Sequence, residues 1–111
     1  MGVLENLEKL LGGPRDNALL RYSLGNECMK QGQAQRAAEY YRGAIEKDGS
    51  YSAAWKMLGK ALAQAQRHQE ALDAWRHGIE VAQARGDVQA AKEMGVFARR
   101  IEKQLGLKSQ D

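Results

Sequence analysis

Residues that favour β-strands are scarce in this sequence. Its 111 residues include four valines and no threonine, and aromatic residues make up only 6%. Because strands are enriched in β-branched and aromatic side chains, this composition argues against a sheet. The single proline leaves long stretches free to form helices. The sequence therefore predicts an all-α protein, and its length allows one domain with one modest core.

Cysteine and long apolar runs are also nearly absent. Cys28 is the only cysteine, so no disulfide framework and no cysteine-based metal site is expected. A lone thiol suits a reducing compartment. No apolar run is long enough to span a bilayer, and residues 1–13 are too short and too charged for a secretory signal. We therefore expect a cytoplasmic protein with no membrane partner.

A strong excess of one charge is missing as well. Lys and Arg number 17 against 14 for Asp and Glu, which gives a formal net charge of +3. The first fifty residues are balanced, so the positive excess lies in residues 51–111. Proteins that bind nucleic acids usually cluster their basic residues more densely. The charge permits an acidic partner and makes nucleic-acid binding the least favoured function.

What the sequence does contain is an internal repeat with a period of 34 residues. Leu24-Gly25 recurs as Leu58-Gly59, and the register holds without a gap. The same offset relates Gln35 to Gln69, Ala37 to Ala71, Tyr41 to Trp75, Arg42 to Arg76, Ala44 to Gly78 and Ile45-Glu46 to Ile79-Glu80. A fixed period of this length is typical of stacked supersecondary units.

Each copy contains two amphipathic segments separated by a polar turn. Apolar residues at steps of three and four predict helices over about 3–11, 16–31, 34–47, 51–65, 68–83 and 87–105. Gly25 and Gly59 are expected to let the paired helices approach closely, with Tyr41 and Trp75 packing between neighbouring copies. The predicted core consists of Leu24, Cys28, Tyr41, Ile45, Trp55, Leu58, Leu62, Trp75, Ile79 and Phe97.

The order of these residues resembles the tetratricopeptide repeat (TPR) family. Trp55–Gly59 (W-K-M-L-G), followed by Ala71, Trp75 and Gly78, matches the family's order of Trp, Leu-Gly, Ala, aromatic and Ala at its 34-residue period. The resemblance implies a right-handed stack of helical hairpins, a TPR-like α-solenoid of about six helices. It also implies an adaptor or scaffold, in which the first helix of each repeat lines a concave groove that holds an extended or helical segment of another protein.

Two repeats alone would leave apolar faces exposed at both ends, so capping segments are expected. Met94-Gly95 is similar to another Leu-Gly pair but follows Leu58-Gly59 by 36 residues, which predicts a linker two residues longer and a third repeat without its second helix. The expected organisation is one domain over 1–106, with a cap at 1–17, repeats at 18–51 and 52–85, a capping helix within 86–106 and a flexible tail at 107–111.

No arrangement of residues points to catalysis, a metal or a cofactor. His68 and His77 are nine residues apart on one predicted helix, so they point to opposite sides and cannot share a metal ion. Cys28 occupies an apolar helical position without a nearby histidine, which favours a packed thiol over a nucleophile. The glycines do not form a phosphate-binding loop. We therefore expect no enzymatic activity and no cofactor.

The remaining candidate site is the exposed face of the first helices. On the resemblance, this face is expected to present Tyr22, Asn26, Lys30, Lys56, Lys60, Lys92 and Arg99. Residues four apart share a helix face, which places Lys56 and Lys60 side by side. The expected partner is an acidic segment of another protein. The alternative is a structural module that self-associates as a homo-oligomer, with nucleic-acid binding as a weaker third possibility.

Overall fold

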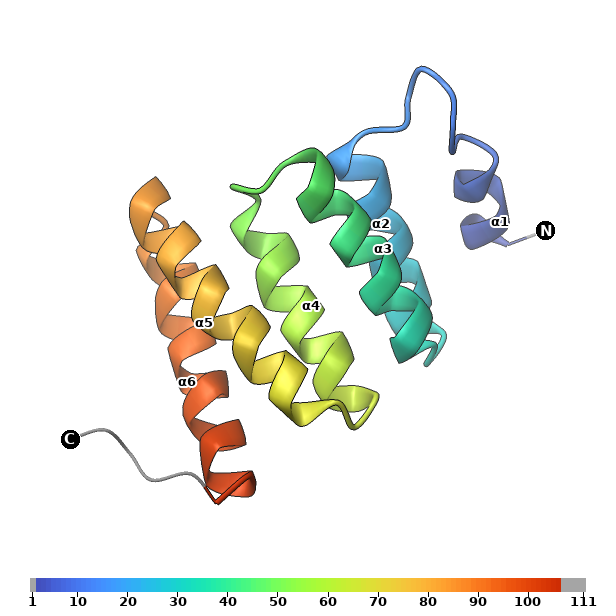
Figure 1. The fold of residues 1–111 in the computed structure, drawn as a ribbon. Helices are drawn as coiled ribbons and strands as arrows, with labels where there is room; N and C mark the ends of the chain where they lie inside the picture. The colour runs from blue at the N-terminus through green and yellow to red at the C-terminus, as the bar shows by residue number, and fades with distance from the viewer. Residues whose placement is uncertain (1, 107–111) are drawn as a thin grey trace.

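The computed structural model describes residues 2–106, which form α-helices and no strand. The helices are α1 (Val3–Glu8), α2 (Ala18–Lys30), α3 (Ala34–Lys47), α4 (Ser52–Gln64), α5 (His68–Arg85) and α6 (Val88–Gln104). They stack as two hairpins, α2 with α3 and α4 with α5, and α1 and α6 lie at the two ends (Figure 1). The predicted all-α class is confirmed, whereas the predicted tail at 107–111 lies outside the described residues.

The first helix is shorter than predicted. The sequence pattern extends it to Leu11, but α1 ends at Glu8. The amides of Leu10 and Leu11 donate to carbonyls three residues earlier rather than four, so the chain tightens into turns. The polar cap of the next helix is Asn17, whose Oδ1 accepts a hydrogen bond from the amide of Leu20 at 2.8 Å.

The extra length before α6 lies in a helix and not in the linker. The sequence predicts a longer linker, but α5 has 18 residues against 14 in α3, and only Gly86 and Asp87 separate it from α6. Gly86 has a φ of 81°, which ends α5 in a left-handed turn. Asp87 then caps α6 and accepts a hydrogen bond from the Ser52 hydroxyl at 2.7 Å. This contact ties the start of α4 to the start of α6.

The three helices α2, α4 and α6 end in the same kind of turn. The residue two positions beyond each helix has a positive φ: 73° at Gly32, 65° at Gln66 and 73° at Gly106. After α2, the amide of Gln33 donates to the carbonyl of Cys28 at 2.8 Å and closes the turn. A left-handed residue suits glycine because it lacks a Cβ. The turn reverses the chain and makes α3 antiparallel to α2, and α5 antiparallel to α4.

Each hairpin is held together by a glycine that receives an aromatic ring. A Cβ on Gly25 would lie 2.5 Å from a ring carbon of Tyr41, and a Cβ on Gly59 would overlap the Trp75 indole. The indole Nε1 donates to the carbonyl of Lys56 at 3.0 Å. Glycine is therefore required at both positions because the ring occupies the space of any side chain.

The position of these rings qualifies one expectation from the sequence. The sequence predicts that Tyr41 and Trp75 pack between neighbouring repeats, whereas each packs on the glycine of its own hairpin. Trp75 also contacts α6, because its ring centre lies 5.4 Å from that of Phe97. Gly78 lies where the second repeat meets α6, since a Cβ there would stand 2.5 Å from the Met94 sulfur. The contacts at Trp75 and Gly78 thus join the last hairpin to α6.

The predicted core is only partly correct. The buried members are Leu24, Cys28, Tyr41, Leu58, Leu62 and Trp75, whereas Ile45, Trp55, Ile79 and Phe97 are partly buried. Trp55 stays near the surface because its ring stacks on His77, with centres 4.4 Å apart, and its Nε1 donates to the carbonyl of Gly49. Phe97 covers Trp75, with ring centres 5.4 Å apart. These partly buried rings form a second layer over the core.

The carboxylate of Glu8 attaches α1 to the first hairpin. It accepts hydrogen bonds from the Tyr40 hydroxyl and the Arg36 guanidinium, both on α3. The hydrogen bond from Tyr40 is the main cause that lowers the pKa of Glu8, and the contact with Arg36 acts in the same direction. Leu4 on the same helix is buried. The short helix α1 is therefore held by the polar contacts of Glu8 and by apolar contacts of Leu4 and the partly buried Leu7.

The glycine contact predicts opposite effects for two alanine substitutions. We expect Gly59→Ala to destabilise the protein by about 1–3 kcal/mol, because the Trp75 ring must move. Gly95→Ala on α6 is the matched control, since a Cβ there meets only an Arg99 guanidinium nitrogen at 3.8 Å. It should stabilise by roughly 0.5–1 kcal/mol through helix propensity. Urea unfolding measures both, and equal stabilities would contradict the contact.

The Glu8 anchor predicts a pH-dependent effect of Glu8→Gln. Because the folded protein lowers the pKa of Glu8, its contribution is complete above the usual glutamate pKa and is lost as the pH falls through the lowered value. At neutral pH the variant should show severalfold faster amide exchange in α1, and the difference should vanish in acid. Glu5→Gln, which changes an exposed carboxylate on the same helix, is the control and should match the unsubstituted protein.

Candidate protein-binding surface

Two of the predicted groove residues, Lys56 and Lys60, lie where α4 meets α6. The Lys56 ammonium is 3.1 Å from Oε1 of Glu93 and forms an ion pair. The Lys60 ammonium lies 5.0 Å from the centre of the Phe97 ring, within the range of a cation–π contact. Among residues 2–106, Lys60 has no acidic partner. The charge of Lys56 is therefore compensated and that of Lys60 is not.

The predicted residues on α2 already have contacts within the protein. The Tyr22 ring lies 5.8 Å from the ring of Tyr41. The Tyr41 hydroxyl donates to Asn26 Oδ1 at 2.6 Å, and burial raises the pKa of Tyr41, so this hydroxyl stays protonated. Lys30 pairs with Glu27 at 3.2 Å, three residues earlier on α2. Asn26 thus uses its oxygen inside the hairpin, and its amide nitrogen is available to donate to a ligand.

A cleft of about 480 Å³ opens beside Asn26 and Lys30. Leu7, Met29 and Met57 give it apolar walls from α1, α2 and α4. Methionine side chains adapt to irregular surfaces, so these walls suit an apolar side chain of a ligand. Sequence reasoning named only the polar members of this cleft. Met29 follows Asn26 by three residues and therefore shares a helix face with it, which could have indicated that Met29 lines the same cleft.

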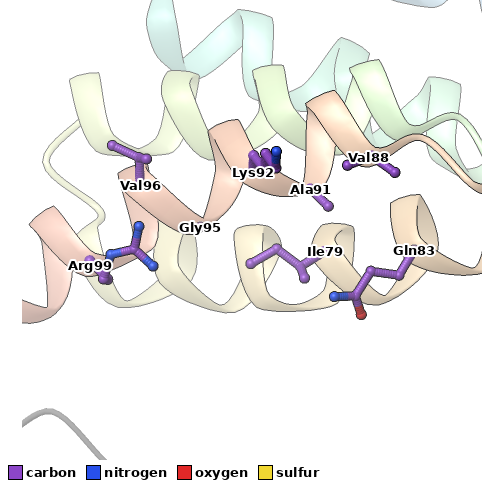
Figure 2. Close-up of a pocket in the computed structure, with 8 residues that line it drawn as sticks. All are labelled: Ile79, Gln83, Val88, Ala91, Lys92, Gly95, Val96 and Arg99. Atoms are coloured by element: carbon purple, nitrogen blue, oxygen red, sulfur yellow. The ribbon is translucent and has the colours of Figure 1, made fainter.

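Lys92 and Arg99 border a second and larger cleft, of about 760 Å³, between α5 and α6 (Figure 2). We call this the α5–α6 cleft. Ile79 and Gln83 form its wall on α5, and residues from Val88 to Arg99 form its wall on α6. Both cations are exposed, and neither forms an ion pair within the described part of the chain. This cleft therefore combines an apolar surface with an uncompensated positive rim.

Six of the seven predicted residues are divided between these two clefts and the α4–α6 contact, whereas Tyr22 lies outside them and packs on the rings of Tyr41 and Tyr51. Sequence reasoning missed the acidic partners, Glu27 of Lys30 and Glu93 of Lys56. Glu93 lies 37 residues after Lys56, a separation at which helical spacing gives no signal. The cations of the predicted set that lack an acidic partner within residues 2–106 are Lys60, Lys92 and Arg99.

Residues that could support catalysis lie apart from these clefts. Cys28 is fully buried, and burial raises the pKa of its thiol, which disfavours the reactive thiolate. His77 stacks on Trp55, whereas His68 contacts Gln66 at the start of α5. Residues 2–106 contain no group of three His, Cys, Asp or Glu side chains placed to hold a metal ion. Over the same range, no helix has the length and apolar character needed to cross a membrane.

Comparison with known proteins identifies the family. A family model described as tetratricopeptide repeat matches residues 14–76. The chain is also similar to TPR repeat-containing protein PA0015 of Pseudomonas aeruginosa, with 46% identity over 101 residues. That match covers 91% of this chain and 96% of the relative. The chain belongs to the tetratricopeptide repeat family.

Solved structures share the fold of this TPR protein. Protein BPP2914 of Bordetella parapertussis is 39% identical, with a TM-score of 0.80 and coverage of 94% of this chain and 90% of that one. A TPR domain protein from Salinibacter ruber is 28% identical, with a TM-score of 0.73 and coverage of 86% and 94%. The predicted right-handed TPR stack is thus confirmed. TPR domains are in general non-enzymatic modules for protein–protein interaction, and this chain has that architecture.

The ion pair between α4 and α6 predicts the outcome of a charge exchange. Lys56→Glu should destabilise the protein by about 1 kcal/mol, because two carboxylates then meet at the contact between the helices. The double variant Lys56→Glu/Glu93→Lys should recover most of that loss, which urea unfolding of the four-member cycle measures. Additive effects of the two substitutions would show that the pair contributes nothing to the attachment of α6.

Proposed function

We propose that this TPR protein is a non-enzymatic adaptor that binds an acidic segment of another protein in a basic concave groove. The groove lies along the first helices of the repeats, α2, α4 and α6. Tyr22, Asn26 and Lys30 would supply its end on α2, where the apolar cleft could take a side chain of the ligand. The ligand is an extended or helical peptide segment.

The uncompensated charge of Lys60 is the observation that carries this proposal. Its ammonium lies 5.0 Å from the centre of the Phe97 ring, and no carboxylate of residues 2–106 pairs with it. Lys92 and Arg99 on α6 add two further positive charges. An exposed ion pair contributes at most about 1 kcal/mol and is screened by salt. Binding should therefore be modest, form rapidly and weaken at high ionic strength.

We also propose how the binding unit is organised and where the protein is located. We place the binding unit in a single domain over residues 1–106, with repeats at 18–51 and 52–85 between the two capping segments. The lone, buried Cys28 favours a reducing compartment, and we place the adaptor in the cytoplasm.

Self-association is the second candidate function, and exposed apolar residues near the N-terminal end favour it. Leu19 is 62% exposed and Val3 is 58% exposed. Exposed apolar side chains are covered when they meet an apolar surface of a second molecule. Light scattering at increasing protein concentration separates this candidate from the adaptor, because only self-association increases the measured mass.

Site-specific crosslinking tests the adaptor proposal. A photoreactive p-benzoylphenylalanine at Lys60 should capture a protein from a lysate of the source cells, and the same group at the exposed Glu39 on α3 should not. Lys60→Glu/Lys92→Glu should then weaken binding of the captured protein by about tenfold or more at low salt, as measured by calorimetry. Lys56 is left unchanged because its replacement would disturb the ion pair with Glu93.

The matched control is Lys9→Glu/Arg15→Glu, which reverses two exposed charges in the N-terminal segment. It changes the net charge by the same amount, so general electrostatic attraction would affect both double variants equally. Unchanged affinity in the folded Lys60→Glu/Lys92→Glu variant would exclude the concave face from binding. Self-association would then be the better account.

A further inference from the structure

The α5–α6 cleft lies where the second helix of a repeat would pack. In the first hairpin Gly25 is covered by Tyr41, and in the second Gly59 is covered by Trp75. Gly95 on α6 is the third glycine of this series. No aromatic ring from residues 2–106 comes within 4 Å of the place where its Cβ would be. The third repeat therefore has its first helix and an empty position for the second.

The shape of the cleft suits a helix. Its wall on α6 runs from Val88 to Arg99, which is about 16 Å at the rise of an α-helix. Val88 is 61% exposed and Val96 is 39% exposed along this wall. Ile79 lines the same cleft from α5 (Figure 2). A helix lying antiparallel to α6, as α5 lies against α4, would cover these apolar side chains.

Unpaired cations of the cleft indicate the charge of its occupant. Elsewhere in the stack, cations that face the next repeat are paired with carboxylates: Arg42 with Glu70 at 2.9 Å, Lys56 with Glu93 at 3.1 Å, and Arg76 with Glu102 at 2.8 Å. Lys92 and Arg99 line the cleft, are exposed and have no carboxylate partner within residues 2–106. The occupant should therefore bring acidic side chains that complement these two charges.

The same charges disfavour a second copy of this chain as the occupant. A two-fold dimer through the cleft would place the same patch of both copies face to face. Lys92 and Arg99 of each copy would then meet like charges, while Glu93 and Glu102 of α6 remain held by internal ion pairs.

We propose that the α5–α6 cleft binds an amphipathic helix of another protein, antiparallel to α6, with an aromatic residue over Gly95 and acidic residues beside Lys92 and Arg99. This interaction goes beyond the proposed concave groove. Lys92 and Arg99 line the cleft and are also cations of the proposed groove, whereas Gly95 belongs only to the cleft and Lys60 only to the proposed groove. Substitutions at Gly95 and Lys60 therefore distinguish the two.

The probe is a fluorescent synthetic peptide with the sequence of residues 67–85, the segment that covers Gly59 through Trp75. Arg67→Glu and Arg76→Glu in the peptide replace two positive charges by two negative ones. Fluorescence anisotropy at low salt should detect binding to the full chain. The peptide with native charges and the acidic peptide carrying Trp75→Ala should each bind at least tenfold more weakly.

Gly95→Leu is the decisive variant of the protein. The space at the position of its Cβ is open, so the variant should unfold at the same or a higher temperature while its side chain fills the cleft. We expect at least a tenfold loss of peptide affinity, and a similar loss for Lys92→Glu/Arg99→Glu. Arg100→Glu, which removes a cation of the same helix outside the cleft, should change affinity less than threefold, and so should Lys60→Glu.

Three results would overturn the proposal. Undiminished binding to folded Gly95→Leu would place the peptide elsewhere, for example on α4 in exchange for α5. A loss with Lys60→Glu but not with Gly95→Leu would assign the peptide to the concave groove. A concentration-dependent dimer of the unsubstituted protein that Gly95→Leu abolishes, measured by sedimentation without peptide, would make a second copy the occupant.

Discussion

The fit of an aromatic ring onto a glycine sets the distance between the two helices of each hairpin. At Gly59 the Trp75 indole takes the place of a side chain, and this close approach lets its Nε1 reach the carbonyl of Lys56. A larger residue at the glycine would separate the helices and break that hydrogen bond. Because a repeat protein is stabilised by contacts between neighbours, the spacing of one hairpin determines how the next one packs on it.

The contact with α6 shows how a change of period is accommodated without a change of packing. The third Leu-Gly-like pair is displaced by two residues, and α5 absorbs the difference through four additional helical residues and a linker shorter by two. Gly78 still receives Met94 from α6, and Asp87 still caps that helix. The helix α6 therefore keeps the place of a first repeat helix, although the helix that should cover Gly95 is absent from residues 2–106.

Periodicity predicted the elements of the fold better than the surroundings of single side chains. Helix positions after residue 16 came within two residues of the structure, since they depend on the local 3.6-residue period. Periodicity also marks which helix face is apolar, but it cannot show that Trp55 would stack on His77 at the surface. For the candidate site, periodicity found the cations on the first helices and missed Glu93. The ion pair between Lys56 and Glu93 joins two helices, so it depends on how neighbouring repeats stack in space.

The two ends of the stack differ in how their charges are paired. Between repeats, cations of one repeat pair with carboxylates of the next, as Lys56 does with Glu93. At the start of the stack, Glu8 of α1 binds Arg36 and Tyr40 of the first hairpin. At the other end, Lys92 and Arg99 remain without carboxylates from residues 2–106, beside a glycine that lacks its ring. The charge and the shape of this end thus specify the same missing neighbour, a helix that is both aromatic and acidic.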